Sequence, residues 1–542
     1  MTDSHSGAFD LKTVPFLAPA LQCRDLPTRR RILATLAGSV AALALPFPSA
    51  QHAQAGEPFS FDALTDRMRE AAAADPVPAE RVEGFIADLS YDGYQRIQFR
   101  TDASRWQDPA SNFRVQAFHL GWLFEEPVRI YEVQNGTARP MTFSTADFEY
   151  RGDLADQVPV DAEMPGVAGF RLLNPLNSAE RFDELVAFLG ASYFRALGRN
   201  NVYGISARGL AVNTALSGEE EFPRFTAFWL ERPALGATEV IVHAALESPS
   251  VTGAYRFVIR PGEDTTMEVT ARIFLRSDIR QLGIAPLTSM FMWGGADPDA
   301  TDDFRTAVHD SEYLIVNTRS GDTRLRALNN PDRLANSYLS LDEPRSFGLI
   351  QRSRDFSDYL DAEAHYEGRP SLMVEPVGDW GQGSVRLIEI PSNFEGNDNI
   401  VAFWVPEAPT RQGDEFEISY RLRWGMNPPG GAGVGLARVI RTRSGVAGVA
   451  GAQIDPDMRK FVIDFEGGVL AEPIDPSDVR AEVGAIRGEI VQSVLSRISG
   501  SHVWRMVLEV RADRGSVVEL RAAIAGFDRN LSETWLYQWV RE

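Results

Sequence analysis

The segment Met267-Glu-Val-Thr-Ala-Arg-Ile-Phe-Leu-Arg276 decides the fold class. Apolar residues occupy every second position from Met267 to Leu275, and most of the positions between them are polar or charged. A period of two predicts a β-strand with one buried face. Val240–Leu246 and Ala254–Arg260 precede it at spacings that suit a β-meander. We therefore expect a mainly all-β protein.

Few helices are expected. Phe61 to Ala74 has a helical pattern, and Ser60 stands where an N-cap would lie. A second helical interruption is predicted over 179–189.

The length of 542 residues favours two domains. Two prolines and a glycine in Pro406-Glu-Ala-Pro-Thr-Arg-Gln-Gly413 predict a linker over 406–413, following a catalytic domain over 56–405. Alternating patterns recur across 414–542, at 416–424, 504–510, 517–524 and 534–540. Their number and spacing are typical of a smaller, immunoglobulin-like β-sandwich.

Residues 1–55 have the features of an export signal. Arg29-Arg30-Arg31 precedes a short apolar stretch that ends before Pro46, and Ala53-Gln-Ala55 is a small-x-small cleavage site. The apolar stretch is too short to span a bilayer, so we expect a signal peptide and no membrane anchor. The arginines predict the twin-arginine pathway, with its export machinery as a partner. Cleavage would remove Cys23, the only cysteine, and with it any cysteine-based catalysis.

Composition and motifs exclude several functions. The chain carries 54 Lys and Arg against 75 Asp and Glu, a balance that repels nucleic acid. No pair of histidines has metal-ligand spacing, and neither a P-loop nor a G-x-S-x-G motif occurs. We expect no metal and no cofactor.

Carboxylates are the remaining candidates for chemistry. Glu395-Gly-Asn-Asp398 precedes an apolar run, and His309-Asp310-Ser-Glu312 lies upstream. Paired carboxylates are what glycosidic-bond hydrolysis needs, and apolar surroundings would raise the pKa of Asp398 and suit it to general acid work. Asp398 is also typical of a turn-stabilising residue within Asn397-Asp-Asn399, and the local pattern alone favours that role.

Aromatic rings supply a second kind of candidate. Trp293, Tyr366 and Trp380 stand in Gly-, Asp- or Pro-rich segments, where a ring can stack on a sugar. Trp404 and Trp424 are expected in the core.

Several ordered blocks carry a family resemblance. They are Phe188–Arg195, Tyr203–Leu210, Phe222–Trp229, Gln281–Pro286, His309–Ser311, Arg369–Leu372 with Val374–Pro376, Asp398–Val401 and Ser532–Tyr537. On these blocks the chain resembles the periplasmic glucan biosynthesis proteins G and D (OpgG, OpgD and MdoG), which include glycoside hydrolases of family 186. The arginine-rich leader resembles the D type.

The resemblance implies a fold, a location and a reaction. It implies a large mutarotase-like β-sandwich, a smaller immunoglobulin-like one, and action in the periplasm on the β-1,2-glucan backbone of osmoregulated periplasmic glucans. The implied reaction is inverting endo-hydrolysis, with Asp398 as general acid and Asp310 as general base. A transglycosylase that produces cyclic glucans and a non-catalytic glucan-binding factor are the alternatives. A homodimer is left open.

The resemblance also suggests roles for further residues. Tyr366 would join the proton relay, and Glu395, Arg369, Trp293 and Trp380 are the predicted substrate contacts. This chain departs from the family at Glu312, His365 and Met373, and in a short loop over 442–452. Met373 stands where a tryptophan is frequent, so a stacking ring is expected to be missing. The short loop lacks the longer aromatic insert that helps cover the cleft in some D-type members.

Overall fold

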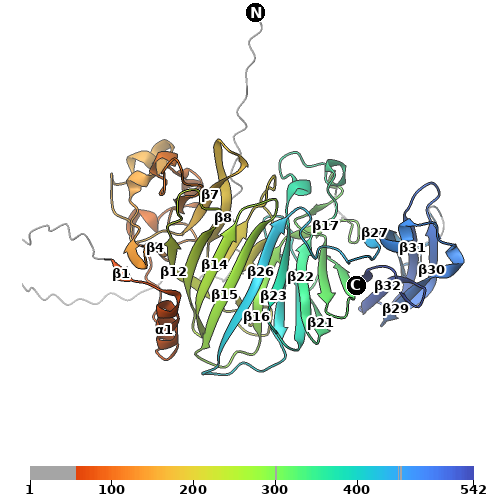
Figure 1. The fold of residues 1–542 in the computed structure, drawn as a ribbon. Helices are drawn as coiled ribbons and strands as arrows, with labels where there is room; N and C mark the ends of the chain where they lie inside the picture. The colour runs from red at the N-terminus through yellow and green to blue at the C-terminus, as the bar shows by residue number, and fades with distance from the viewer. Residues whose placement is uncertain (1–55, 299–301, 450, 452–454, 542) are drawn as a thin grey trace, which may run out of the picture.

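The structure is a computed structural model that describes residues 56–298, 302–449, 451 and 455–541. The predicted signal peptide, 1–55, lies outside the described residues. The regular structure of the described chain is mainly β-sheet, with helices α1 (Phe61–Ala72) and α2 (Tyr91–Tyr94) and several short 3-10 turns (Figure 1). The prediction of a mainly all-β fold is confirmed.

The predicted meander forms the middle of the larger sheet. Strands β13 (Val240–Glu247), β14 (Val251–Arg260) and β15 (Thr265–Leu275) pair antiparallel in sequence order. The alternation in β15 buries Met267 to Leu275 at every second position against the main core. Phe274 points the other way and is buried too, because α1 packs on that face. The Ser60 side chain accepts a hydrogen bond from the Ala63 N–H, which confirms the predicted N-cap.

Two sheets form the layers of the large sandwich. Within the described residues, the larger sheet has sixteen strands. Its order is β1 (Glu57–Pro58), β5 (Thr137–Pro140), β4 (Arg129–Gln134), β12 (Arg224–Glu231), β13, β14, β15, β26 (Glu415–Gly425), β23 (Ser371–Val377), β22 (Pro344–Ile350), β19 (Tyr313–Thr318), β20 (Thr323–Ala327), β34 (Thr534–Val540), β32 (Val517–Gly526) and β29 (Val479–Ile486), with β33 (Arg529–Asn530) beside β32.

The second sheet covers one face of the first. Its order is β21 (Ala335–Leu341), β24 (Gly383–Glu389), β25 (Ile400–Pro406), β16 (Leu282–Ser289), β10 (Ser206–Arg208), β9 (Tyr193–Ala196), β8 (Arg181–Leu189), β7 (Gly169–Ser178) and β3 (Arg114–Phe118), with β11 (Leu210–Val212) beside β16. Two short ribbons accompany it, β17 (Phe291–Trp293) with β18 (Val308–His309), and β2 (Ile97–Phe99) with β6 (Phe148–Tyr150). The segment 179–189, predicted as helical, is mostly strand β8, because its apolar run pairs between β7 and β9.

The C-terminal sandwich shares the larger sheet. Strands β27 (Arg438–Val446), β28 (Met458–Glu466), β31 (Trp504–Arg511) and β30 (Glu489–Arg497) form its second layer, at the blue end of Figure 1. A core that includes Phe461, Trp504 and Trp535 lies between this layer and β34, β32 and β29. β34 itself pairs parallel with β20, so the two sandwiches are joined by continuous sheet.

The predicted linker 406–413 is not the boundary between the domains. The strand that follows it, β26, inserts between β15 and β23 of the large sandwich. Its apolar face, including Tyr420 and Trp424, is buried in the main core. The C-terminal sandwich therefore begins after β26, because the alternation that identified this strand does not specify which sheet it joins.

No helix within 56–541, leaving out the undescribed positions, is long and apolar enough to cross a membrane.

Candidate active site

The two candidate carboxylates lie on either side of one backbone segment, Met290–Phe291, at the end of β16. The Asp310 N–H donates to the Met290 carbonyl at 2.8 Å. Asn399, the neighbour of Asp398, accepts from the Phe291 N–H at 2.8 Å and donates to the Phe291 carbonyl at 2.9 Å. Residues 88 positions apart in sequence are thereby brought to one place, and Asp398 lies just before β25 as predicted.

Asp310 is buried and paired with a cation. Its side chain is 8% exposed, and it accepts a hydrogen bond from the Arg369 guanidinium. Burial raises the pKa of Asp310, and the positive charge of Arg369 opposes that rise. The pairing favours the ionised carboxylate, which is the state that a general base requires.

Tyr366 completes this side of the site. It opens a 3-10 turn (Tyr366–Gly368), is only 2% exposed, and its ring lies 4.1 Å from the Arg369 guanidinium carbon. Burial raises the pKa of the Tyr366 hydroxyl well above its usual value, so the hydroxyl stays protonated. The predicted group of Asp310, Tyr366 and Arg369 is therefore assembled in one place.

Asp398 has the environment expected of a general acid. Burial raises its pKa to about 6, and the negative charge of Asp310 adds to the rise. The positive charges of Arg208 and Arg195 act against it. A carboxyl with this pKa holds its proton into the mildly acidic range, unlike an ordinary aspartate.

Arg208 and Arg195 were missed by the sequence reasoning. In the second sheet Ser206 pairs with Thr288 of β16, and Arg208 pairs with Tyr193 of β9, which places these strands beside Asp398. Arg208 is almost completely buried and pairs with Glu220 at 3.3 Å. The sequence did offer a signal: Arg208 lies in a short strand of small residues, where it is expected to be buried. A buried cation needs a nearby anion, so this arginine indicates a carboxylate close by.

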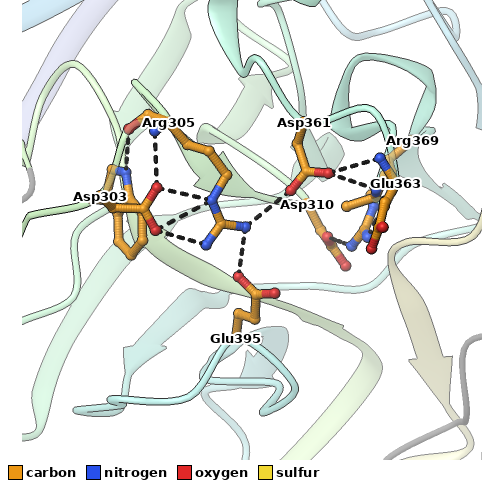
Figure 2. A network of polar contacts seen from close by, with 9 residues as sticks. Asp303, Arg305, Asp310, Asp361, Glu363, Arg369 and Glu395 are labelled. Atoms are coloured by element: carbon orange, nitrogen blue, oxygen red, sulfur yellow. Dashed lines mark hydrogen bonds and ion pairs between the residues drawn. The ribbon is translucent and has the colours of Figure 1, made fainter.

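Glu395 belongs to a second ionic network (Figure 2). The Arg305 guanidinium contacts Asp303 at 2.9 Å, Asp361 at 3.0 Å and Glu395 at 2.9 Å. Its central carbon lies 5.5 Å from the ring of Trp293. The charge of Glu395 also acts on Tyr366. Glu395 and Trp293 thus border the carboxylate pair, and Arg305 and Asp361 are additional residues that the sequence did not single out.

Sequence comparison places this site in a family. A family model described as "Periplasmic glucan biosynthesis protein, MdoG" matches residues 59–539. The chain belongs to this family. "Glucans biosynthesis protein G" of Cereibacter sphaeroides is 54% identical over 543 residues, covering 96% of this chain and 100% of the relative. The same-named protein of Rhodopseudomonas palustris is 43% identical, covering 94% and 99%, and that of Dickeya dadantii is 39% identical, covering 89% and 93%.

Membership of the MdoG family shows that the protein is periplasmic and acts in glucan biosynthesis. A galactose mutarotase related enzyme from Lactobacillus acidophilus matches 48% of this chain and 91% of its own, with 10% identity and a TM-score of 0.21. The relatives named above carry the G-type name, whereas assignment to the D type rests on the leader, which lies outside the described residues.

Two predictions about aromatic contacts change with the structure. Trp380 lies away from the carboxylates: its ring packs against Trp404 and Tyr420, and its indole N–H donates to the Ser419 carbonyl at 3.2 Å. Trp380 therefore packs against the edge of the main core. Met373 is fully buried between the large sheet and the C-terminal layer, so a tryptophan at this position would not offer a ring to substrate.

The remaining departures from the family lie around the site, at Glu312 and His365, and in the C-terminal layer, at 442–452. Glu312 accepts hydrogen bonds from the backbone N–H groups of Arg352 and Ser353 at 3.1 and 2.9 Å, so it fixes the loop after β22. His365 lies 3.1 Å from Glu367 at the edge of the site. The predicted short loop 442–452 begins as strand β27, and its residues 450 and 452 lie outside the described residues. No group of three His, Cys, Asp or Glu in the described part of the chain could hold a metal ion.

Proposed function

We propose that this protein is an inverting endo-β-1,2-glucanase, with Asp398 as general acid and Asp310 as general base. The observation that carries the proposal is the difference in environment between two neighbouring carboxyls, Asp310, which is buried, and Asp398, which is partly buried. Burial and the charge of Asp310 raise the pKa of Asp398 to about 6. Burial also raises the pKa of Asp310, but the Arg369 guanidinium that contacts this carboxylate opposes the rise and favours its charged form. Such a division into a proton donor and a proton acceptor is what glycoside hydrolysis requires.

The proposed reaction follows from these protonation states. Asp398 donates its proton to the glycosidic oxygen while the bond from that oxygen to the anomeric carbon breaks. A water molecule attacks the anomeric carbon from the opposite face, and its proton passes to Asp310, directly or through the polar groups around Tyr366. The new hydroxyl has the inverted configuration, and both carboxyls regain their starting states by proton exchange with solvent.

Substrate binding is assigned to the border of the site. Glu395 is 43% exposed on its side chain and can accept hydrogen bonds from sugar hydroxyls, and Trp293 offers an aromatic face. Arg305 holds both residues, so it positions the binding groups without acting on the reacting bond.

The decisive experiment incubates the mature protein with linear β-1,2-glucan and identifies the products by chromatography and mass. Short linear products with inverted anomeric configuration support the proposal. Cyclic products support the transglycosylase, and binding without any product supports a non-catalytic glucan-binding factor; either result refutes the hydrolase. Asp398→Asn is expected to lose activity and keep glucan binding, while the exposed Asp88→Asn serves as the matched control and keeps both.

A further inference from the structure

A large groove lies at the end of the sandwich opposite the carboxylates. It has a volume of about 640 Å³, within the range of ligand sites, and is lined by the ends of β19, β20, β21, β24 and β25. Strand β25 connects the two places: Ile400 follows the Asp398 loop, and Pro406 lines the groove. The strand rises roughly 3.3 Å per residue, so the six steps from Ile400 to Pro406 separate the carboxylate site from the groove by about 20 Å.

The groove has an exposed aromatic platform. The Tyr338 side chain lines it and is 51% exposed. The Arg386 guanidinium carbon lies 5.3 Å from the ring, and the Tyr338 hydroxyl accepts a hydrogen bond from Gln281 at 3.2 Å. These contacts hold the ring in place while half of its surface faces solvent. A fixed, exposed tyrosine ring is suited to stacking on the apolar face of a sugar.

The polar lining favours an uncharged ligand. Arg319 is ion-paired with Glu343, and Arg324 pairs with Asp322 at 3.0 Å. Asp342 accepts a hydrogen bond from Gln382 at 3.3 Å. Both arginines of the lining are ion-paired, and Glu407 adds a further carboxylate, so the groove has no positive field that would select an anion. The lining still offers many N–H donors and carboxylate acceptors, which match the hydroxyl groups of a saccharide.

We infer that this groove is a second binding site for a segment of the glucan chain, separate from the carboxylate pair. The identity of the sugar rests on membership of the glucan biosynthesis family, and the inference does not require hydrolysis. A long chain that reaches both sites binds more tightly than a short one, because occupancy of one site raises the local concentration at the other. The groove would therefore hold the polymer while its cleavable bonds are presented elsewhere.

Equilibrium binding of linear β-1,2-glucan to Asp398→Asn protein tests the inference, because turnover is then removed. Adding Tyr338→Ala is expected to weaken binding of long chains about fivefold or more and to leave binding of short oligosaccharides at the carboxylate site unchanged. Gln382→Ala leaves the stacking of Tyr338 intact and is expected to act in the same direction. Phe527→Ala, an equally exposed ring on the C-terminal sandwich, is the matched control.

Hydrogen exchange of the glucan-bound protein locates the contact. Protection of the segments around 340–343 and 380–384, in addition to 391–399, supports the second site. Protection confined to 391–399, equal loss in the Phe527→Ala control, or no effect of either groove variant would overturn it. Failure of the proposed hydrolysis can be distinguished from failure of the second site. In that case the native protein forms no products from the glucan, while the binding and exchange experiments still show the second site.

Discussion

Replacing Asp398 by asparagine is predicted to stabilise the fold while removing the proposed acid. Asparagine has nearly the shape of a protonated aspartic acid but never ionises. In the native protein the ionised form of Asp398 is disfavoured by burial and by the charge of Asp310, as the rise of its pKa from 3.8 to about 6 records. The native protein loses unfolding free energy whenever this carboxyl is charged, and the variant should not have this loss.

The pKa shift sets the size and the pH range of the effect. The folded pKa lies about 2 units above the unfolded value, and each unit corresponds to ~1.4 kcal/mol, so the full cost is about 3 kcal/mol. Because the folded pKa is raised, stability is greatest below pH 3.8 and falls as the pH rises through about 6. Asp398→Asn should thus match the native protein near pH 4 and exceed it by about 2–3 kcal/mol near pH 8.

Urea denaturation of the two proteins at pH 4 and pH 8 measures this difference. Tryptophan fluorescence reports on both sandwiches, because Trp404 and Trp424 are buried in the large one and Trp504 and Trp535 in the C-terminal one. Asp88→Asn, on the surface, should show no comparable change between the two pH values. A gap between Asp398→Asn and native protein that is the same at both pH values would refute the reasoning, because it would mean that ionisation of Asp398 is not disfavoured in the fold.

Three further outcomes are expected. Asp310→Asn removes a negative charge and should lower the pKa of Asp398 below about 6, measured by carbon-13 NMR of labelled aspartates; an unchanged pKa would contradict coupling of the pair. Glu533→Ala leaves Arg352 without its buried partner, which it contacts at 2.7 Å. The variant should lose about 3–5 kcal/mol of unfolding free energy in urea denaturation. A loss below ~1 kcal/mol would argue against this link between the sandwiches. Ser60→Ala removes the cap of α1 and should cost ~1 kcal/mol, seen as faster hydrogen exchange over 61–72; unchanged exchange would show the cap to be unimportant.

Local features of the fold could be predicted from the sequence, but the pairing of distant segments could not. The period-two alternation of 267–275 identified β15 because one of its faces meets the core along most of its length. β26 has the same alternation, yet its place between β15 and β23 depends on pairing with residues more than 100 positions away in β15 and more than 40 positions away in β23. The sequence did not identify Arg195 and Arg208 as site residues for the same reason, because their partners lie on other strands and in other loops.

The ambiguity at Asp398 arises because one short loop both forms a turn and carries the proposed acid. The tight connection into β25 does need polar side chains, and Asn399 supplies them through its bonds to Phe291 and to the Ile390 carbonyl at 3.1 Å. Asn397 adds a backbone bond to the Phe394 carbonyl at 3.1 Å. With the flanking asparagines stabilising the turn, the carboxyl of Asp398 lies in the field of Asp310 and Arg208. The local pattern correctly predicted a turn, but only the tertiary contacts distinguish the residue that stabilises the turn from the proposed acid.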